Sequence, residues 1–402
     1  MSNPNNNLFK FANILKQEGS NITPYLQDCF KYLHQNPELS FQEFETSCFI
    51  QKELTSFGVK LQDIDSKVGV VGLLQGGKPG PCVALRADID ALPIKEESSC
   101  TFPSKKQGIF HGCGHDAHTA ALLGAAKILS SLKEELPGTV KFIFQPAEEG
   151  AGGAKYLTQK GCMDHPKVDA VFGLHNAPTV ASYKLGLKTG GIMAAVHKFT
   201  VTLTGKGGHG AIPETNIDSI VAAAAMIQSL QTITSRNVPP SKACVVSICS
   251  IHGGDGLTFN VNPETVTFCG TCRCYSPEME ILIQKRFHDI VENMASAYQV
   301  KAKIQYETLH SAVINPKELY ETAVSVAEVL NIPYECPIAS TAGDDFSTFS
   351  EYAPSYFYWL GNYAEEKDTV YPLHSPKFKI DTDTLSLGAS VYAMSAIMYL
   401  MK

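Results

Sequence analysis

The segment Thr139–Gly150 reads Thr-Val-Lys-Phe-Ile-Phe-Gln-Pro-Ala-Glu-Glu-Gly and holds the clearest information on the fold. Its first half is rich in β-branched and aromatic residues and follows a Pro-Gly turn, which predicts a buried strand over 139–144. Two adjacent carboxylates, Glu148 and Glu149, come soon after. Adjacent acidic residues usually lie in a solvated loop, but at the end of a buried strand two unpaired carboxylates would be costly. A nearby cation would remove that cost.

Helical and strand-like segments alternate around this strand. Short apolar runs bounded by glycine and proline predict further strands, and helical periodicity or an alanine-rich composition predicts the helices between them. Buried strands that alternate with helices indicate a layered α/β domain. The expected strands cover residues 70–74, 82–86 and 168–174, and the expected helices lie within 22–57, 117–132 and 153–160.

Polar side chains follow three of the expected strands. Asp88, the Glu148-Glu149 pair and His175 each come just after one of them. Because open α/β sheets bind ligands where the carboxyl ends of the strands meet, we expect these side chains to share one edge of the sheet. Asp88 alone could be a salt-bridged strand end, or it could orient a metal-binding imidazole.

A different pattern begins near Lys188 and ends near residue 307. Its elements follow the order β-α-β-β-α-β, which is that of a ferredoxin-like sandwich. The segment contains few candidate ligands, which suits a lid or a dimerisation domain. We therefore expect a mixed-sheet α/β/α catalytic domain, interrupted by a ferredoxin-like α+β domain. The expected segments are 1–187 (catalytic), 188–307 (inserted) and 308–402 (catalytic).

The octet His111–His118 packs three histidines, a cysteine and an aspartate into eight residues. Thiolate and imidazole are preferred ligands of zinc-like ions, and the glycines allow the backbone to fold closely around one. A histidine-rich turn beside a buried thiol is the plain alternative. Isolated histidines at 175 and 374 are by default structural residues, but together with the octet and Glu148-Glu149 they indicate a metal-dependent hydrolase.

The composition is that of an ordinary globular enzyme. At 402 residues the chain is long enough for two domains with cores of their own. A net charge of −7 without a basic run argues against nucleic acid as a partner. No apolar stretch reaches the ~20 residues that span a bilayer, and the N-terminus lacks the layout of a secretion signal. Twelve scattered cysteines suit reduced thiols, so we expect a cytoplasmic protein.

Four motifs resemble those of one family. They are Leu33–Leu39 (LHQNPEL), His111–His118 (HGCGHDAH), Phe144–Gly150 (FQPAEEG) and Gly205–Ala211 (GKGGHGA). In combination they resemble the metal-dependent N-acyl-amino-acid amidohydrolases, which include hippurate hydrolases and auxin-conjugate hydrolases. This family is related to the carboxypeptidase G-type and aminoacylase metallopeptidases. The resemblance runs almost end to end, from Leu33 to the segment around His374.

The resemblance implies a dinuclear metal site with a bridging thiolate. Glu148 would be the general base, which takes a proton from the attacking water and returns it to the departing amine. Zinc, manganese, cobalt and nickel all suit a mixed set of thiolate, imidazole and carboxylate ligands. The implied ligands are Cys113, which bridges, together with His115, Glu149, His175 and His374.

The resemblance also assigns roles in the inserted domain. The equivalent of His209 stabilises the oxyanion in this family, often from the partner subunit of a dimer, so we expect a homodimer or a higher homo-oligomer. Asn260 and Arg273 resemble positions that contact substrate, and a guanidinium group suits the carboxylate of an amino acid. A surface-strand arginine is the plain alternative for Arg273.

The expected reaction is hydrolysis of an N-acyl or N-aroyl amino acid, such as hippurate or an N-acetyl amino acid, to a carboxylic acid and a free amino acid. A dipeptidase or aminopeptidase with the same dinuclear site is the first alternative. A second is a cysteine amidase in which Cys113 is the nucleophile and His115 lies nearby. A third is an inactive metal-holding or peptide-binding protein. The presence of Glu148 argues against it, because loss of the base would be the simplest sign of lost activity.

Overall fold

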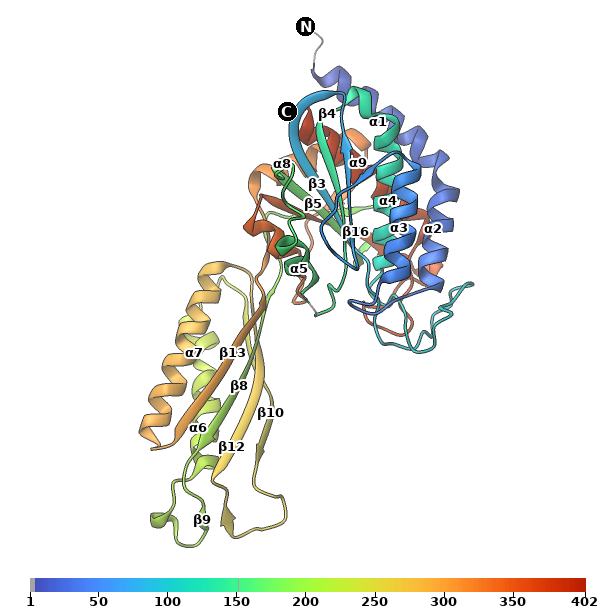
Figure 1. The fold of residues 1–402 in the computed structure, drawn as a ribbon. Helices are drawn as coiled ribbons and strands as arrows, with labels where there is room; N and C mark the ends of the chain where they lie inside the picture. The colour runs from blue at the N-terminus through green and yellow to red at the C-terminus, as the bar shows by residue number, and fades with distance from the viewer. Residues whose placement is uncertain (1–3, 151) are drawn as a thin grey trace. The chain divides into compact units, whose positions relative to one another are not determined.

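The computed structural model describes residues 4–150 and 152–402. The chain divides into two compact units, drawn in Figure 1. The first unit combines three separate stretches of sequence: Met1–Gly190, Ile314–Ile338 and Asp345–Lys402. The second unit consists of Gly191–Val313 and Ala339–Asp344.

An eight-stranded mixed sheet forms the centre of the first unit, in the order β1-β2-β4-β3-β5-β16-β6-β15. Its four middle strands are parallel neighbours. The prediction of a mixed α/β fold is confirmed. The middle strands are β4 (Pro137–Gln145), β3 (Lys78–Asp88), β5 (Ala170–Ala181) and β16 (Ser355–Tyr363). The outer strands are β1 (Lys60–Leu61), β2 (Val70–Gln75), β6 (Leu185–Gly186) and β15 (Tyr334–Glu335).

The middle strands are buried on both faces, which explains their continuous apolar sequences. Side chains alternate between the faces, so neighbouring residues of one strand identify the two layers. Gly173 of β5 faces Phe346, since a Cβ atom there would lie 2.7 Å from the Phe346 ring. The next residue, Leu174, contacts the opposite layer at Gly388. The sheet is therefore covered on both sides.

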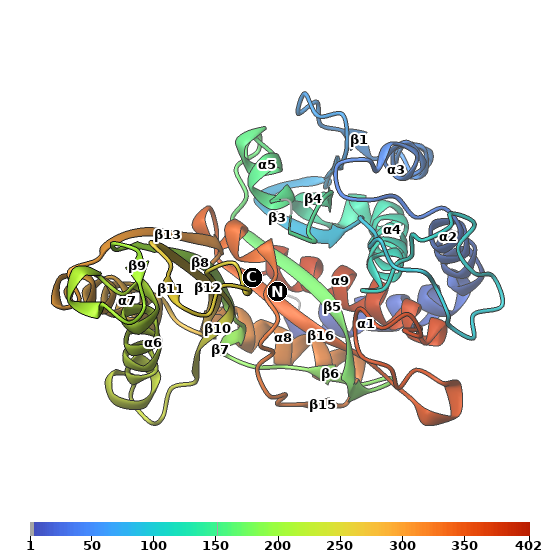
Figure 2. The ribbon, with the colours of Figure 1, turned by 90° about the horizontal axis from the view of Figure 1, so that it is seen from below.

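Helices α4 and α9 pack on the Leu174 face, with α1 and α2 against them, while α5 and the turn η4 lie on the Gly173 face (Figure 2). Both α4 and α9 are buried around most of their circumference. The helices of this unit are α1 (Pro4–Asn21), α2 (Thr23–Gln35), α3 (Phe44–Ser56), α4 (His115–Ser131), α5 (Gly153–Gln159), α8 (Lys317–Leu330) and α9 (Leu385–Leu400), and η4 spans Asp345–Glu351. None of the helices in the described part of the chain has the length and hydropathy of a membrane span.

The second unit contains an antiparallel sheet in the order β10-β12-β8-β13, joined by two helices in the sequence β-α-β-β-α-β. This is the connectivity of a ferredoxin-like sandwich. The elements are β8 (Ala195–Thr204), α6 (Ser219–Leu230), β10 (Cys244–Gly253), β12 (Thr265–Cys274), α7 (Pro277–Ala297) and β13 (Lys301–His310). A two-stranded sheet of β9 (Gly208–His209) and β11 (Val261–Asn262) adjoins them in sequence, and β7 (Gly190–Met193) and β14 (Val313–Asn315) lie where the chain passes between the units.

Candidate metal centre

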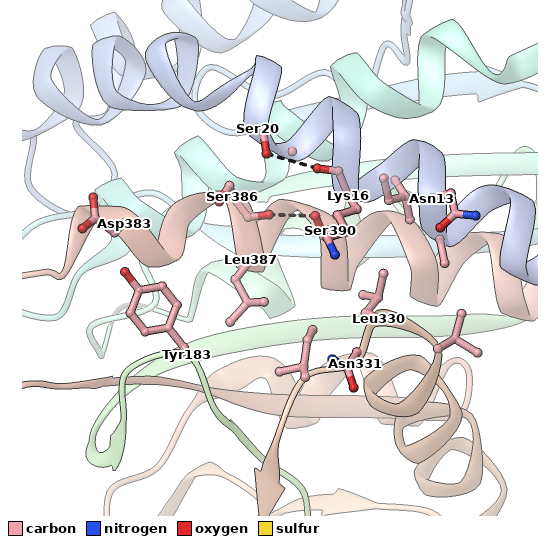
Figure 3. Close-up of a pocket in the computed structure, with 15 residues that line it drawn as sticks. Asn13, Lys16, Ser20, Tyr183, Leu330, Asn331, Asp383, Ser386, Leu387 and Ser390 are labelled. Atoms are coloured by element: carbon pink, nitrogen blue, oxygen red, sulfur yellow. Dashed lines mark hydrogen bonds between the residues drawn. The ribbon is translucent and has the colours of Figure 1, made fainter.

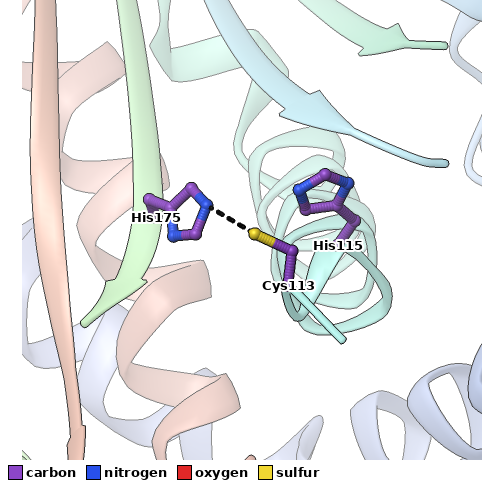
Figure 4. A group of neighbouring side chains, drawn as sticks. All are labelled: Cys113, His115 and His175. Atoms are coloured by element: carbon purple, nitrogen blue, oxygen red, sulfur yellow. Dashed lines mark hydrogen bonds between the residues drawn. The ribbon is translucent and has the colours of Figure 1, made fainter. Parts of the chain in front are cut away.

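A left-handed glycine places the first two donors side by side. Gly114 has φ +84° at the start of α4, and a Cβ atom there would lie 2.6 Å from the Asn176 amide nitrogen and 2.9 Å from Ile380. Only glycine fits this turn without strain. The turn puts the Cys113 thiol and the His115 imidazole on the same end of the helix, as Figure 4 shows.

His175 approaches this turn from β5. Its Nε2 lies 3.4 Å from Cys113 Sγ (Figure 4), and its Nδ1 lies 2.9 Å from the carbonyl oxygen of Asn176. An Nδ1–H that donates to this carbonyl leaves Nε2 with a free lone pair directed at the thiol. Burial, with the neighbouring His118, holds the pKa of His175 well below its usual value, so the imidazole is neutral as a metal ligand must be.

The Glu148-Glu149 loop is anchored by one buried carboxylate. Asp90 accepts the backbone N–H of Glu148 through Oδ1 and that of Glu149 through Oδ2, each at 3.1 Å. Ala147, just before the pair, has φ +53° and turns the chain back toward the cluster. As a result Glu149 Oε1 lies 4.0 Å from His115 Nε2.

His374 comes from far along the sequence and is tied to the same turn. Its backbone N–H donates to the carbonyl oxygen of Gly112 at 2.8 Å. Its Nε2 lies 3.2 Å from Glu149 Oε1. The side chain is about half exposed, so this is the solvent-facing side of the cluster.

The donor atoms fit a cation. His115 Nε2 and Glu149 Oε1 are both buried, and neither has a hydrogen-bond partner among the described residues. Buried polar atoms without partners are costly, and a metal ion is the partner that both can share. The ligand atoms form overlapping groups in which all lie within 4.8 Å of one another: Cys113, His115 and His175; Cys113, Glu149 and His374; and His115, Glu148 and Glu149. The structure thus brings all five expected ligands and the expected base together.

Electrostatics within the cluster also favour a cation. Burial and the carboxylates of Glu149, Glu148 and Asp88 raise the pKa of the Cys113 thiol well above its usual value. Burial lowers the pKa of His115, but Asp88, Asp90 and Glu149 outweigh burial and raise it to about 10. Acidic side chains therefore dominate the site, and a divalent ion would compensate them.

Asp90, a residue outside the four motifs, orients a predicted ligand. His115 Nδ1 lies 2.9 Å from the backbone oxygen of Asp90 and 3.2 Å from its Oδ1. Asp88 instead accepts the Nδ1–H of His118 at 2.5 Å and a hydrogen bond from Arg86 at 2.8 Å. The sequence signal for this role was present in the Asp-Ile-Asp spacing, but the spacing did not say which aspartate faces which ring.

The expected substrate residues lie in the second unit. His209 in β9 and Asn260 are exposed and adjacent, because Gly210 N–H donates to the Asn260 carbonyl oxygen at 2.8 Å. Arg273 is half-buried eight residues beyond the start of β12, roughly 27 Å along the strand. Its guanidinium donates to the Cys272 carbonyl oxygen at 2.9 Å and to the Thr271 hydroxyl. The unit brings His209 and Asn260 together and keeps Arg273 apart from them.

A cavity of about 340 Å³ elsewhere in the first unit has no part in this chemistry (Figure 3). It lies between α1, α9 and the end of α8, and residues such as Lys16, Asn331 and Ser386 line it. No histidine, cysteine or predicted site residue lines it.

The geometry of the donors agrees with the relationships of the chain. Residues 84–397 match the family described as peptidase family M20/M25/M40. The chain belongs to this family. The resemblance to metal-dependent N-acyl-amino-acid amidohydrolases is confirmed, since M20 relatives carry deacetylase, amino-acid hydrolase and carboxypeptidase names.

Two curated M20 relatives and one solved structure illustrate the match. The N-acetyl-L-cysteine deacetylase of Bacillus subtilis (strain 168) is 40% identical over 362 residues, covering 90% of this chain and 85% of the relative. The IAA-amino acid hydrolase ILR1-like 2 of Arabidopsis thaliana is 37% identical over 374 residues, with 92% and 83% covered. The YXEP protein of Bacillus subtilis, described as a dinuclear metal binding peptidase from the M20 family, superimposes with a TM-score of 0.84 at 33% identity, with 95% and 99% covered.

Proposed function

We propose that this M20 protein hydrolyses the amide bond of N-acyl or N-aroyl amino acids to a carboxylic acid and a free amino acid. It is a metal-dependent amidohydrolase, as its membership of the family implies, and the names of its relatives support acylated amino acids as the substrate class. One observation carries the proposal: sulfur, nitrogen and oxygen donors from distant parts of the sequence converge beside the Glu148 carboxyl group.

Two divalent cations would be held by the five convergent ligands, and zinc, manganese, cobalt and nickel all suit this mixed set. When bound, such a pair polarises the scissile carbonyl and lowers the pKa of the attacking water. The residues that would hold the two ions are Cys113, His115, Glu149, His175 and His374.

Glu148 acts as the base in this proposal. Its carboxyl group belongs to the same donor group as His115 and Glu149, and its backbone is fixed by Asp90. Glu148 takes a proton from the attacking water and then delivers it to the amide nitrogen, which leaves poorly as an anion. Glu148 is 9% exposed, so its side chain lies just below the surface of the first unit.

The charges around Cys113 oppose the cysteine-amidase alternative. A cysteine nucleophile is activated by positive neighbours that stabilise the thiolate. Cys113 is instead surrounded by the carboxylates of Glu149, Glu148 and Asp88, in addition to the nearby His175. This environment suits a metal ligand and disfavours a free nucleophile.

The second unit supplies the remaining groups in this proposal, as a lid or dimerisation domain. His209 would stabilise the oxyanion from the partner subunit of a homodimer. Asn260 lies next to it, because its carbonyl oxygen accepts the Gly210 N–H. Arg273 would bind the substrate carboxylate from a separate position. We also propose a cytoplasmic location, because all twelve cysteines are free thiols and reducing compartments maintain thiols in that state.

A metal-resolved activity screen tests the function. Purified protein is stripped with a chelator, reloaded separately with zinc, manganese, cobalt or nickel, and assayed on hippurate, N-acetyl amino acids and dipeptides with matched residues. We expect turnover of the acylated amino acids only after reloading. Faster turnover of the dipeptide than of its N-acetylated counterpart would favour the dipeptidase or aminopeptidase alternative, and no turnover of either would favour the inactive metal-holding alternative.

A further inference from the structure

A second group of metal-type ligands lies in the first unit, outside the five ligands described above. His34 near the end of α2 offers one nitrogen atom, and Glu96 and Cys100, from the segment between β3 and α4, offer one oxygen and one sulfur atom. All three atoms lie within 4.8 Å of one another. The His34 Nε2 to Glu96 Oε1 distance is 3.2 Å, and the Cys100 sulfur lies within 4.8 Å of both partners.

The separation between His34 and Glu96 is close to that between two ligands of one zinc ion. Zinc binds nitrogen and oxygen at about 2.0–2.1 Å and sulfur at about 2.3 Å, so tetrahedral ligands lie roughly 3.3–3.8 Å apart. The His34–Glu96 distance already agrees with this range to about 0.1 Å. A shift of the Cys100 side chain of about 1 Å at most closes the set.

The surrounding groups hold the ligands in the required orientation. Asp116, 1% exposed, lies 2.7 Å from His34 Nδ1 through its Oδ2. An imidazole whose Nδ1–H binds a buried carboxylate directs Nε2 outward as a ligand, as in carboxylate–histidine–zinc triads. Glu96 is fixed as well, because its Oε2 accepts the Ser104 backbone N–H at 2.6 Å and its Oε1 accepts the Ser98 hydroxyl.

A cavity gives access to the cluster. It has a volume of about 180 Å³ and is lined by His34 and Cys100 together with Phe30, Phe102 and Lys379. The space is sufficient for a hydrated ion and a water ligand. The Lys379 ammonium group is already engaged, since it donates to the Ser99 hydroxyl at 3.2 Å and to the Lys367 carbonyl oxygen at 3.1 Å.

We propose that His34, Glu96 and Cys100 form a third metal site, separate from the dinuclear centre, that binds one Zn²⁺ ion with solvent as the fourth ligand. Two carboxylates, Asp116 and Glu96, face the imidazole, so the cluster favours a positive charge at Nε2. A proton there would give a simple ion pair. The adjacent Cys100 thiol favours zinc over a proton as the source of that charge, because sulfur is a soft ligand that zinc prefers.

The test counts metal in the complete protein. Holoenzyme is dialysed against buffered free Zn²⁺, and bound metal per protomer is measured by elemental analysis. We expect one equivalent more in the wild type than in Cys100→Ser, whose zinc affinity at this site should fall by more than the roughly 10–100-fold typical of losing a supporting group. Cys48→Ser and Cys336→Ser, which change exposed thiols, should match the wild type.

A spectroscopic measurement separates this site from the dinuclear centre. With Co²⁺ as the probe, the difference spectrum between wild type and Cys100→Ser should show thiolate-to-cobalt charge transfer, because the contribution of Cys113 cancels. Equal metal content and identical cobalt spectra in the two folded proteins would overturn the proposal. If Cys100→Ser does not fold, Glu96→Gln decides by the same comparison. If the proposed dinuclear centre were absent, the metal content of wild type and of every variant would fall by the same amount. The difference between wild type and Cys100→Ser would stay unchanged.

Discussion

His118 donates its Nδ1 proton to Asp88 across 2.5 Å, and both side chains are fully buried. The other ring nitrogen of His118 accepts the backbone N–H of Asn176 at 3.0 Å. Since Asn176 follows His175 within β5, the pair fixes the part of this strand from which a proposed ligand projects. Asp88 therefore supports the His175 side of the cluster, and its Oδ2 also lies 3.7 Å from His115 Nε2, while Asp90 contacts His115 Nδ1.

Glu148→Gln should abolish most turnover while both metal ions stay bound. The amide cannot accept the proton, and a positioned base contributes about 10²–10⁴-fold to such a rate. Steady-state kinetics on an N-acetyl amino acid and metal analysis check this together. Glu366→Gln, at an exposed glutamate, is the control and should behave as wild type. Near-normal turnover in Glu148→Gln would remove this residue from the mechanism.

Asp90→Asn should weaken metal binding about 10–100-fold, as expected for a residue that orients a ligand. The carboxylate contacts the His115 ring and both backbone N–H groups of Glu148 and Glu149, and an amide cannot accept all of these bonds. Competition titration with a chelator measures the change in affinity. An unchanged affinity with lowered turnover would show that Asp90 serves the Glu148 loop alone.

His209→Ala should lower turnover at constant metal content. If the imidazole acts across a dimer, mixing His209→Ala with Glu148→Gln protein should regain activity, because mixed dimers contain one site with both groups intact. His252→Ala, at another exposed histidine of the second unit, is the matched control. Activity that depends on mixing indicates action in trans, and the absence of any gain would restrict His209 to its own subunit.

Glu43→Gln should change the pH dependence of stability. Glu43 is buried and accepts the Ala147 backbone N–H at 2.8 Å, and burial, with Asp90 nearby, raises its pKa from 4.5 to about 7. Between these values the folded protein keeps a proton that the unfolded chain releases. This group therefore lowers the free energy of unfolding as pH rises from about 4.5 to 7, by up to about 3 kcal/mol.

The glutamine keeps an oxygen for the Ala147 bond but cannot ionise. The free energy of unfolding of Glu43→Gln minus that of wild type should thus be larger at pH 8 than at pH 5, by up to about 3 kcal/mol. Urea unfolding at both pH values measures the difference. The same stability difference at both values would contradict a buried, titrating Glu43.

Gly124→Ala should destabilise the protein by about 1–3 kcal/mol, although alanine is the better helix former. A Cβ atom at Gly124 in α4 would lie 2.5 Å from Leu26 and 3.1 Å from Ala389, so α2 and α9 would have to move. Gly19→Ala in α1 is the control, because its Cβ atom meets only the end of the Ser390 side chain at 3.2 Å and a more distant carbonyl. An equal fall in the midpoint temperature of thermal unfolding in both variants would contradict this packing argument.

Local sequence predicted where the middle strands lie but not how far they run, since His175, expected just after a strand, lies inside β5 (Ala170–Ala181). The apolar runs around 82–86 and 139–144 needed only composition and turn signals, and β3 and β4 contain them. Helix α9 was not predicted, because Leu385–Leu400 is apolar around its whole circumference and shows no helical periodicity. Whether this segment forms a helix or a strand depends on its burial among other elements, and no local sequence pattern indicates that burial.

The site was predictable in its residue types but not in its pairings. Motifs named the five proposed ligands, but which nitrogen of His115 faces Asp88 and which faces Asp90 depends on a ring orientation set by the tertiary structure. The bond between His34 and Asp116 joins residues 82 positions apart, and no spacing rule connects them. The separation of Arg273 from His209 likewise follows from the register of β12 and not from either motif.

The first unit is assembled from both ends of the polypeptide, with β16 seated beside β5 and α9 packed on β3, β4 and β5. At typical rates of synthesis, about 5–20 residues per second, roughly 10–40 s separate the end of β5 from the start of β16 on the ribosome. During that interval the nascent chain exposes a hydrophobic sheet edge and an uncovered face. We therefore expect biosynthesis of this enzyme to depend on chaperones that shield the nascent chain until translation is finished.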